Sequence, residues 1–371
     1  MLDLAARLAL RGVGAVEPNP LVGCVLVKDG RVIGMGHHRR YGGPHAERDA
    51  LESCRRENQD PRGSTAYVTL EPCNAHGKQP PCVSALIEAG VARVVFAQRD
   101  FSEHKGGGAE ALRAAGIACE QSAESPLATS LAAPFLKRML SGMPWVIAKW
   151  AQTIDGRIAT RTGESKWISG EGARRRVHQL RARVDAVLTG IGTVLADDPM
   201  LTARGVPVRR TAARVVADTD LDLPAESALA QSAREFPTFV ACDASLTTAD
   251  ISRRRRAELE SAGVRLIPVP GSRRAGGGSA IDLTALLRTL HTEHQVSTVM
   301  VEAGPGVLGS LIEEDLVDEA VIYIAPMLLG DELAKSVAVG RVAEQLRSAR
   351  RYTLWRSRVV GDDIELTYRR R

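Results

Sequence analysis

The chain has 371 residues, of which 44% are hydrophobic and 25% are charged. This length exceeds what a single hydrophobic core holds, so two domains are expected. The composition excludes a disordered, fibrous or small disulfide-stabilised protein. The 49 basic and 44 acidic residues leave a net charge of +5, spread along the chain. Charge alone therefore gives no argument for nucleic-acid binding.

The cysteines also narrow the class of protein. The chain has six of them, and two lie beside a His-x-Glu motif, so metal chemistry in a reducing cytoplasm is expected rather than a disulfide framework. The apolar period of residues 1–8 is interrupted by Asp3 and Arg7, and no later stretch is apolar for long enough to span a bilayer. We expect neither secretion nor a membrane partner.

The first part of the chain alternates between predicted strands and helices. An apolar run at 21–28, followed by Asp29-Gly30 and a second run at 31–34, predicts an antiparallel hairpin. The pattern then predicts a helix over 45–56, a strand over 65–70, a helix over 81–88 and a strand over 92–97. An irregular region ends at 141–144, where we place the domain junction. Residues 1–143 are thus predicted to form one α/β layer domain.

Residues 144–371 are predicted to form a second α/β domain. Strands are expected at 145–150, 186–189, 214–217, 238–241, 264–269, 298–302 and 321–325, with helices between several of them. The glycine-rich segment 275–279 predicts a surface loop. The four arginines at 253–256 are flanked by acidic residues without aromatics, which favours a solvated helix face over a nucleic-acid site.

Three residues of the first domain have the chemistry of zinc ligands. His45 begins a predicted helix, Cys73 follows a predicted strand, and Cys82 begins the next helix. One imidazole and two thiolates suit Zn²⁺ and leave the fourth tetrahedral position for water, as in catalytic zinc sites. Glu47, two residues after the His, is predicted to transfer protons.

The motifs around these ligands resemble a known family. His-x-Glu followed by Pro-Cys and a second Cys is typical of zinc deaminases acting on an amino-substituted pyrimidine or purine ring. The eight residues between the cysteines, with NPLVG at 19–23 and TLEPC at 69–73, resemble the deaminase half of the bifunctional riboflavin-biosynthesis deaminase-reductases. This resemblance implies a cytidine-deaminase-like α/β/α sandwich, with Asn19, His76 and Lys78 near the pyrimidine and its ribose phosphate.

The second half contains segments similar to the family's reductase domain, in the family's order, at 148–159, 162–169, 190–199 and 201–204. The resemblance implies a dihydrofolate-reductase-like α/β domain that uses NADPH to reduce a ribosyl Schiff base to a ribityl chain. Lys149 and Asp155 are the expected catalytic residues. The residues that match the family's cofactor contacts are Ala151, Trp167, Thr193, Asp197, Thr219, Gly304, Pro305, Gly306, Val307, Leu308, Gly309 and Ser310. Those that match its substrate contacts are Ser165, Arg181, Leu201, Arg204 and Glu302.

The glycines at 304–309 formally match the Gly-x-Gly-x-x-Gly dinucleotide fingerprint between a strand and a helix. The next predicted strand ends in Pro326 rather than in an acidic residue, so we reject a Rossmann domain. Glycines before a helix still allow backbone N–H groups to approach a pyrophosphate, so a phosphate cradle is expected.

The leading hypothesis is a two-step enzyme. Zinc-dependent deamination of 2,5-diamino-6-ribosylamino-pyrimidinone 5′-phosphate is followed by NADPH-dependent reduction of the ribosyl chain. The expected partners are this small phosphorylated substrate and further copies of the chain, and no nucleic acid. One alternative is a paralogue acting on another pyrimidine or a pteridine-like compound, motivated by Ala75 and by Gly106-Gly107-Gly108. Another is a nucleic-acid-binding deaminase with a non-catalytic second domain.

Overall fold

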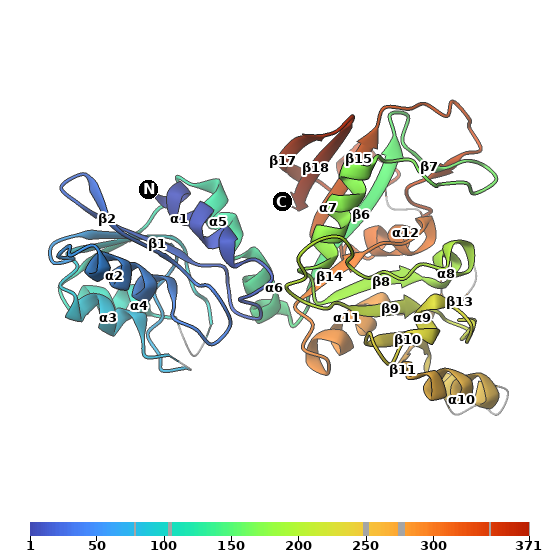
Figure 1. Cartoon of the computed structure of the whole chain (residues 1–371), viewed down its shortest axis with the longest axis horizontal. Coiled ribbons are helices and arrows are strands. Elements are labelled where there is room, and N and C mark those ends of the chain that lie inside the picture. Colours follow the sequence, from blue (N-terminus) through green and yellow to red (C-terminus); the bar gives the residue numbers. More distant parts are fainter. Residues whose placement is uncertain (78, 103–105, 248–251, 274–278, 341–342, 371) are drawn as a thin grey trace. The chain divides into compact units, whose positions relative to one another are not determined.

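The computed structural model describes residues 1–371 except 78, 103–105, 248–251, 274–278, 341–342 and 371. The chain divides into two compact units, Met1–Met143 and Pro144–Arg371 (Figure 1). Within the described residues, no helix has both the length and the apolar character needed to cross a membrane.

The first unit is a three-layer α/β/α sandwich. Its sheet has the order β2-β1-β3-β4-β5, with β1 antiparallel to β2 and β3, and β3, β4 and β5 parallel. The strands are β1 (Gly23–Lys28), β2 (Arg31–His37), β3 (Thr65–Leu70), β4 (Arg93–Gln98) and β5 (Ala118–Gln121). The hairpin turn at Asp29-Gly30 is confirmed, with positive φ at both residues.

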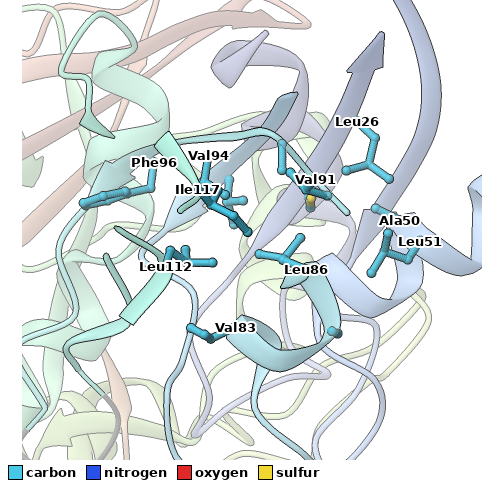
Figure 2. Close-up of a cluster of buried hydrophobic side chains, with 14 of the residues drawn as sticks. Leu26, Ala50, Leu51, Val83, Leu86, Val91, Val94, Phe96, Leu112 and Ile117 are labelled. Carbon is cyan, nitrogen blue, oxygen red and sulfur yellow. The ribbon is translucent and has the colours of Figure 1, made fainter. Parts of the chain in front are cut away.

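Helices cover both faces of this sheet. α1 (Leu2–Ala9) and α5 (Pro126–Leu131) pack on one face. α2 (Ala46–Arg56), α3 (Cys82–Glu88) and α4 (Gly108–Ala114) pack on the other, and α6 (Ala133–Ser141) ends the unit. Figure 2 shows the larger cluster, in which Leu86, Phe96 and Leu112 are almost fully buried between the sheet and these helices. The predicted sandwich is confirmed, and its core fixes the helix starts that carry His45 and Cys82.

The second unit is built on a nine-stranded sheet of order β11-β10-β9-β8-β14-β6-β15-β18-β17. The seven strands from β11 to β15 are parallel, and β18 and β17 are antiparallel. In this order β14 lies between β8 and β6, so the sheet does not have the 3-2-1-4-5-6 strand order of a Rossmann domain. The strands are β6 (Trp145–Thr153), β8 (Ala186–Gly190), β9 (Ala213–Ala217), β10 (Thr238–Asp243), β11 (Arg265–Val269), β14 (Thr298–Val301), β15 (Glu319–Ala325), β17 (Tyr352–Val360) and β18 (Asp363–Arg370).

The remaining elements of the second unit connect or cover these strands. The short strands β7 (Arg157–Ala159) and β16 (Lys335–Ser336) pair with each other, as do β12 (Gly271–Arg273) and β13 (Ser279–Ile281). The helices are α7 (Glu171–Arg181), α8 (Ile191–Asp197), α9 (Ala228–Gln231), α10 (Arg253–Ala262), α11 (Leu283–Thr292) and α12 (Pro305–Glu313). The arginine run lies on α10, where Arg254 pairs with Glu258 at the surface, as predicted. The predicted loop at 275–279 lies mostly outside the described residues.

Sequence reasoning did not anticipate the C-terminal hairpin of β17 and β18. In β18 the buried positions are Asp363, Glu365 and Thr367, whereas Ile364 is 43% exposed. The buried acids face α7, where Asp363 Oδ2 accepts a hydrogen bond from Gly170 N at 2.8 Å and Glu365 binds Arg176 at 2.9 Å. In β18 the polar side chains therefore face the interior and Ile364 faces solvent, which is the opposite of the usual strand pattern. A search for apolar residues at every second position cannot find such a strand.

Candidate zinc and reductase sites

The structure brings His45, Cys73 and Cys82 together in the first unit. His45 is the N-cap of α2, Cys82 is the first residue of α3, and Cys73 follows β3. His45 Nδ1 lies 3.5 Å from Cys73 Sγ and 3.4 Å from Cys82 Sγ. A tetrahedral Zn²⁺ with ordinary bond lengths would hold a nitrogen and a sulfur about 3.5 Å apart. The three donors therefore fit a zinc ion, and the described residues form no other such cluster.

The surroundings favour negatively charged sulfur at this site. The N–H of Cys82, at the start of α3, points to Cys73 Sγ at 3.4 Å. Hydrogen bonding from Cys82, together with His45, lowers the pKa of the Cys73 thiol, while the same contact and burial raise the pKa of the Cys82 thiol, so the negative charge is held on Cys73. Thiolate is the form in which cysteine binds metals, so this helix start is suited to zinc.

Glu47 lies in the first turn of α2 and is only 3% exposed. Burial, followed by the negative charge of Cys73, raises the pKa of Glu47 to about 7. A buried carboxyl group with such a pKa can both accept and donate a proton near neutral pH. Its position beside the ligands agrees with the proton-transfer role predicted from the sequence.

A pocket opens over these ligands. Its lining consists of Asn19, Tyr41, Gly42, Gly43, His45, Cys73, Ala75, Gly77 and Gln79. Asn19 is thus placed at the site, whereas His76 is exposed and absent from this lining, and Lys78 lies outside the described residues. Gln79 Nε2 donates to Gly42 O at 3.1 Å, which ties the inter-cysteine loop to the 41–43 segment.

Sequence reasoning missed His38, which is 2% exposed and lies edge-on to His45 with ring centroids 5.4 Å apart. His38 Nδ1 is 2.8 Å from Pro44 O, and its Nε2 is 3.1 Å from Asn19 Nδ2. Because a carbonyl can only accept, Nδ1 carries the proton and Nε2 accepts from the Asn19 amide. His38 therefore orients Asn19. In the sequence, the position of His38 directly after β2 is the one sign of this role. The contact with Asn19 itself forms only when the β1–β2 hairpin folds.

A second missed residue, Glu71, fixes the end of β3 next to Cys73. Its side chain is fully buried and accepts hydrogen bonds from the N–H groups of Asp100 at 3.1 Å and Ala109 at 2.8 Å. At Gly108, a Cβ would lie 1.8 Å from Pro72 O. The start of α4 is therefore packed directly against the segment that presents Cys73.

In the second unit, Glu302 joins two cations in a buried cluster. Arg181 donates to Glu302 Oε1 at 2.5 Å and Oε2 at 2.9 Å, and Lys149 Nζ donates to Oε2 at 3.2 Å. Burial raises the pKa of Glu302, but attraction to Arg181 and Lys149 outweighs it and lowers the pKa to about 2. Arg181 also donates to Thr202 O at 3.1 Å. Arg181 is thus engaged within the protein, whereas Arg204 is exposed.

Asp155 lies in the turn after β6 and makes a different set of contacts. Its carboxylate accepts hydrogen bonds from Thr153 Oγ1 at 2.5 Å, Gly330 N at 2.9 Å and Leu329 N at 3.3 Å. The hydrogen bond from Thr153, followed by that from the Gly330 amide, lowers the pKa of Asp155 to about 2. These contacts anchor the chain after β15, and the expected catalytic role of Asp155 stays a prediction.

Four residues that match cofactor contacts lie at or just beyond the carboxyl ends of adjacent parallel strands. Ala151 is near the end of β6, and Thr193, Thr219 and Gly304 follow β8, β9 and β14. Thr193 Oγ1 accepts a hydrogen bond from Gly304 N at 3.2 Å. Ligands of open α/β sheets bind at this edge of the sheet. The arrangement thus suits an extended cofactor.

Two further predicted cofactor residues lie on exposed segments. Trp167 is 67% exposed, and the guanidinium of Arg174 lies 4.6 Å from its ring centroid. Asp197, in the last turn of α8, pairs with Lys166 at 2.9 Å. Of the predicted substrate residues in this unit, Ser165 is half-buried and Leu201 is buried.

The segment expected to form the phosphate cradle, residues 304–310, contains a helix start that suits a phosphate and a later part that packs inside the protein. Gly304 is the N-cap of α12, so Pro305, Gly306 and Val307 form its first turn, as a cradle requires. Leu308 and Gly309 are buried. A Cβ at Gly309 would lie 1.9 Å from Val339 O, so this glycine accommodates a crossing backbone. Ser310 Oγ donates to Gly306 O at 3.1 Å.

Comparison with known proteins covers both units. The cytidine and deoxycytidylate deaminase zinc-binding region matches residues 1–98, and the RibD C-terminal domain matches residues 144–366. The riboflavin biosynthesis protein RibD of Escherichia coli (strain K12) is 38% identical over 361 residues, with 97% of this chain and 96% of that protein covered. RibD of Aquifex aeolicus is 35% identical over 371 residues, with 100% and 97% covered.

A solved structure agrees over the same length. The diaminohydroxyphosphoribosylaminopyrimidine deaminase/5-amino-6-(5-phosphoribosylamino)uracil reductase of Thermotoga maritima is 31% identical with a TM-score of 0.79, and the match covers 100% of this chain and 97% of that one. RibD of Acinetobacter baumannii, in its form 1, is 35% identical with a TM-score of 0.78 over 100% and 98%.

Proposed function

The chain belongs to the RibD family of bifunctional riboflavin-biosynthesis deaminase-reductases, and from this premise we propose which residues carry each reaction. The family combines a zinc-dependent deaminase with a reductase that uses NADPH. The proposed substrate of the first reaction is the diaminopyrimidinone ribosylamine phosphate, and its deaminated product is the substrate of the second.

In the deaminase, His45, Cys73 and Cys82 hold zinc. When bound, zinc supplies a water whose pKa is lowered to about 7. Glu47 takes a proton from the attacking water and delivers it to the amino group, which leaves as ammonia. Asn19, oriented by His38 at 3.1 Å, binds the polar edge of the pyrimidine. The burial of Glu47 in the first turn of α2 supports this assignment, because the carboxyl group is held beside the metal ligands.

In the reductase, the cluster of Lys149, Arg181 and Glu302 lies on β6, at the end of α7 and just after β14. NADPH supplies the reducing equivalents. Reduction of the C=N bond also requires a proton on nitrogen, and Lys149, held 3.2 Å from Glu302, is the proposed donor. Arg204 is exposed and is the proposed partner of the substrate phosphate. Arg181 instead positions Glu302.

The convergence of His45, Cys73 and Cys82, with ligand atoms within 4.8 Å of one another, carries the proposal. The purified protein is incubated with the pyrimidine substrate, with and without NADPH, while ammonia and nicotinamide absorbance are followed. We expect ammonia in both reactions, and oxidation of NADPH only where deamination has occurred. Absence of ammonia from zinc-loaded protein would reject the deaminase assignment.

The proposal includes a cytoplasmic location and a homo-oligomeric state. All six cysteines are buried and unpaired, which suits a reducing compartment. Light scattering coupled to size-exclusion chromatography tests the oligomeric state, and a mass equal to one chain at micromolar concentration would contradict it.

A further inference from the structure

His178 connects α7 to the segment that carries two predicted substrate residues. It lies in the last turn of α7, one helical turn before Arg181. Its Nδ1 is 3.2 Å from the carbonyl oxygen of Thr202 and 3.2 Å from the backbone nitrogen of Arg204. A single ring nitrogen therefore touches the backbone on both sides of residue 203.

This segment adopts a conformation that requires support. Leu201 has φ of +53°, in the left-handed region, and its side chain is 4% exposed. A branched side chain is disfavoured in this region, so the backbone persists there only when its surroundings hold it. Arg181 holds the carbonyl of Thr202 from one side. His178 is the side chain that also reaches the amide of Arg204.

The hydrogen-bond partners of His178 determine which protonation state of its imidazole can hold Arg204. The N–H of Arg204 can only donate, whereas the carbonyl of Thr202 already accepts from Arg181 at 3.1 Å. A neutral ring protonated on Nε2 leaves Nδ1 to accept from Arg204 N–H. Burial, followed by the charges of Arg181 and Arg204, lowers the pKa of His178, and these causes outweigh the Thr202 carbonyl and Glu302, which act in the opposite direction. The environment thus favours the neutral ring that holds Arg204.

We propose that His178 is a positioning residue of the reductase, which holds segment 201–204 through the amide of Arg204 so that the guanidinium of Arg204 meets the phosphate ester of the substrate. This inference rests on the proposed function, in which Arg204 binds that phosphate. The ligand class is a phosphate monoester, and His178 acts on it through Arg204 without touching the reacting atoms.

The test uses the full-length enzyme and the deaminated pyrimidine phosphate. We expect His178→Ala to raise the reductase KM for this substrate five- to tenfold, with kcat and the KM for NADPH changed by less than twofold. In His178→Asn, Oδ1 takes the place of Nδ1 and restores the KM to within about twofold of the wild-type value. In His178→Gln, the polar atoms lie further out, near the position of Nε2, so the KM stays high. Urea unfolding followed by the fluorescence of the four tryptophans, which all lie in the second unit, shows whether the reductase unit of each variant is folded.

Arg204→Gln separates failure of this inference from failure of the proposed function. If Arg204→Gln raises the KM and His178→Ala does not, the positioning role of His178 is refuted while the phosphate assignment stands. If neither variant changes the KM, the phosphate assignment fails and the inference fails with it. If both raise it, the double variant is expected to raise the KM no more than Arg204→Gln alone, because His178 acts through Arg204. If the increases in KM of the two single variants multiply in the double variant, His178 does not act through Arg204 and the inference is refuted.

Discussion

Replacement of Glu302 by Gln removes the carboxylate that holds two cations in the second unit. The side chains of Glu302, Arg181 and Lys149 are only 10%, 12% and 17% exposed. In Glu302→Gln, Arg181 and Lys149 keep their charges without the carboxylate that now compensates them. Breaking a buried ion pair in this way typically costs about 3–5 kcal/mol. We therefore expect loss of both stability and reductase activity.

The pKa of Glu302 gives a second estimate of the stability that Glu302→Gln would lose. A fall from 4.5 in the unfolded chain to about 2 in the folded protein corresponds to roughly 3 kcal/mol of stabilisation at neutral pH. Because the pKa is lowered on folding, this stabilisation is fully present above pH 4.5 and is lost as the pH falls towards 2. The difference between the wild type and Glu302→Gln should therefore shrink below pH 4.5.

Urea unfolding followed by tryptophan fluorescence measures this effect, since all four tryptophans of the chain lie in the second unit. The matched control is Glu258→Gln, which removes an ion pair with Arg254 whose side chains are 46% and 91% exposed. Such surface pairs contribute at most about 1 kcal/mol. A Glu302→Gln protein as stable as the control at pH 7 would refute the electrostatic argument.

Three further predictions concern the first unit. Glu47→Gln should lower the deaminase rate about 100- to 10,000-fold with zinc content unchanged. The control Glu52→Gln, at an exposed position of the same helix, should leave the rate unchanged. A Glu47→Gln protein as active as this control would show that Glu47 takes no part in the reaction. Cys82→Ser should reduce zinc content and ammonia release while NADPH oxidation with supplied deaminated substrate continues, and retention of stoichiometric zinc would exclude Cys82 as an essential ligand. Gly108→Ala should lower the free energy of unfolding of the first unit by about 1–3 kcal/mol, because its Cβ would clash with Pro72 O at 1.8 Å. Urea unfolding of this unit is followed by the loss of ammonia release, since the tryptophans lie in the second unit, and an unchanged midpoint would show that the backbone yields freely.

Local patterns were sufficient to predict the zinc cluster and most strands. The sequence predicts His45 and Cys82 at helix starts, and in the structure they occupy the N-cap of α2 and the first position of α3. The predicted strand at 65–70 is β3 (Thr65–Leu70). These features depend on residue type and spacing within a few positions, which is the information that a single sequence carries.

Features that depend on long-range contacts could not be predicted in the same way. The β17–β18 hairpin buries Glu365 against Arg176, so its inner face is charged and lacks an apolar alternation. His38 meets Asn19 only because the chain returns along β2 to the start of β1. His178 meets Arg204 across two secondary-structure elements. Each contact pairs polar groups whose partners are set by the tertiary fold.

The most direct test of the account is X-ray absorption spectroscopy at the zinc edge, with zinc content measured on the same preparation. We predict about one zinc ion per chain, with two sulfur ligands at about 2.3 Å and nitrogen or oxygen ligands at about 2.0–2.2 Å. A deaminating protein without zinc, or a zinc ion bound by four sulfurs, would contradict the assignment of an open site formed by His45, Cys73 and Cys82.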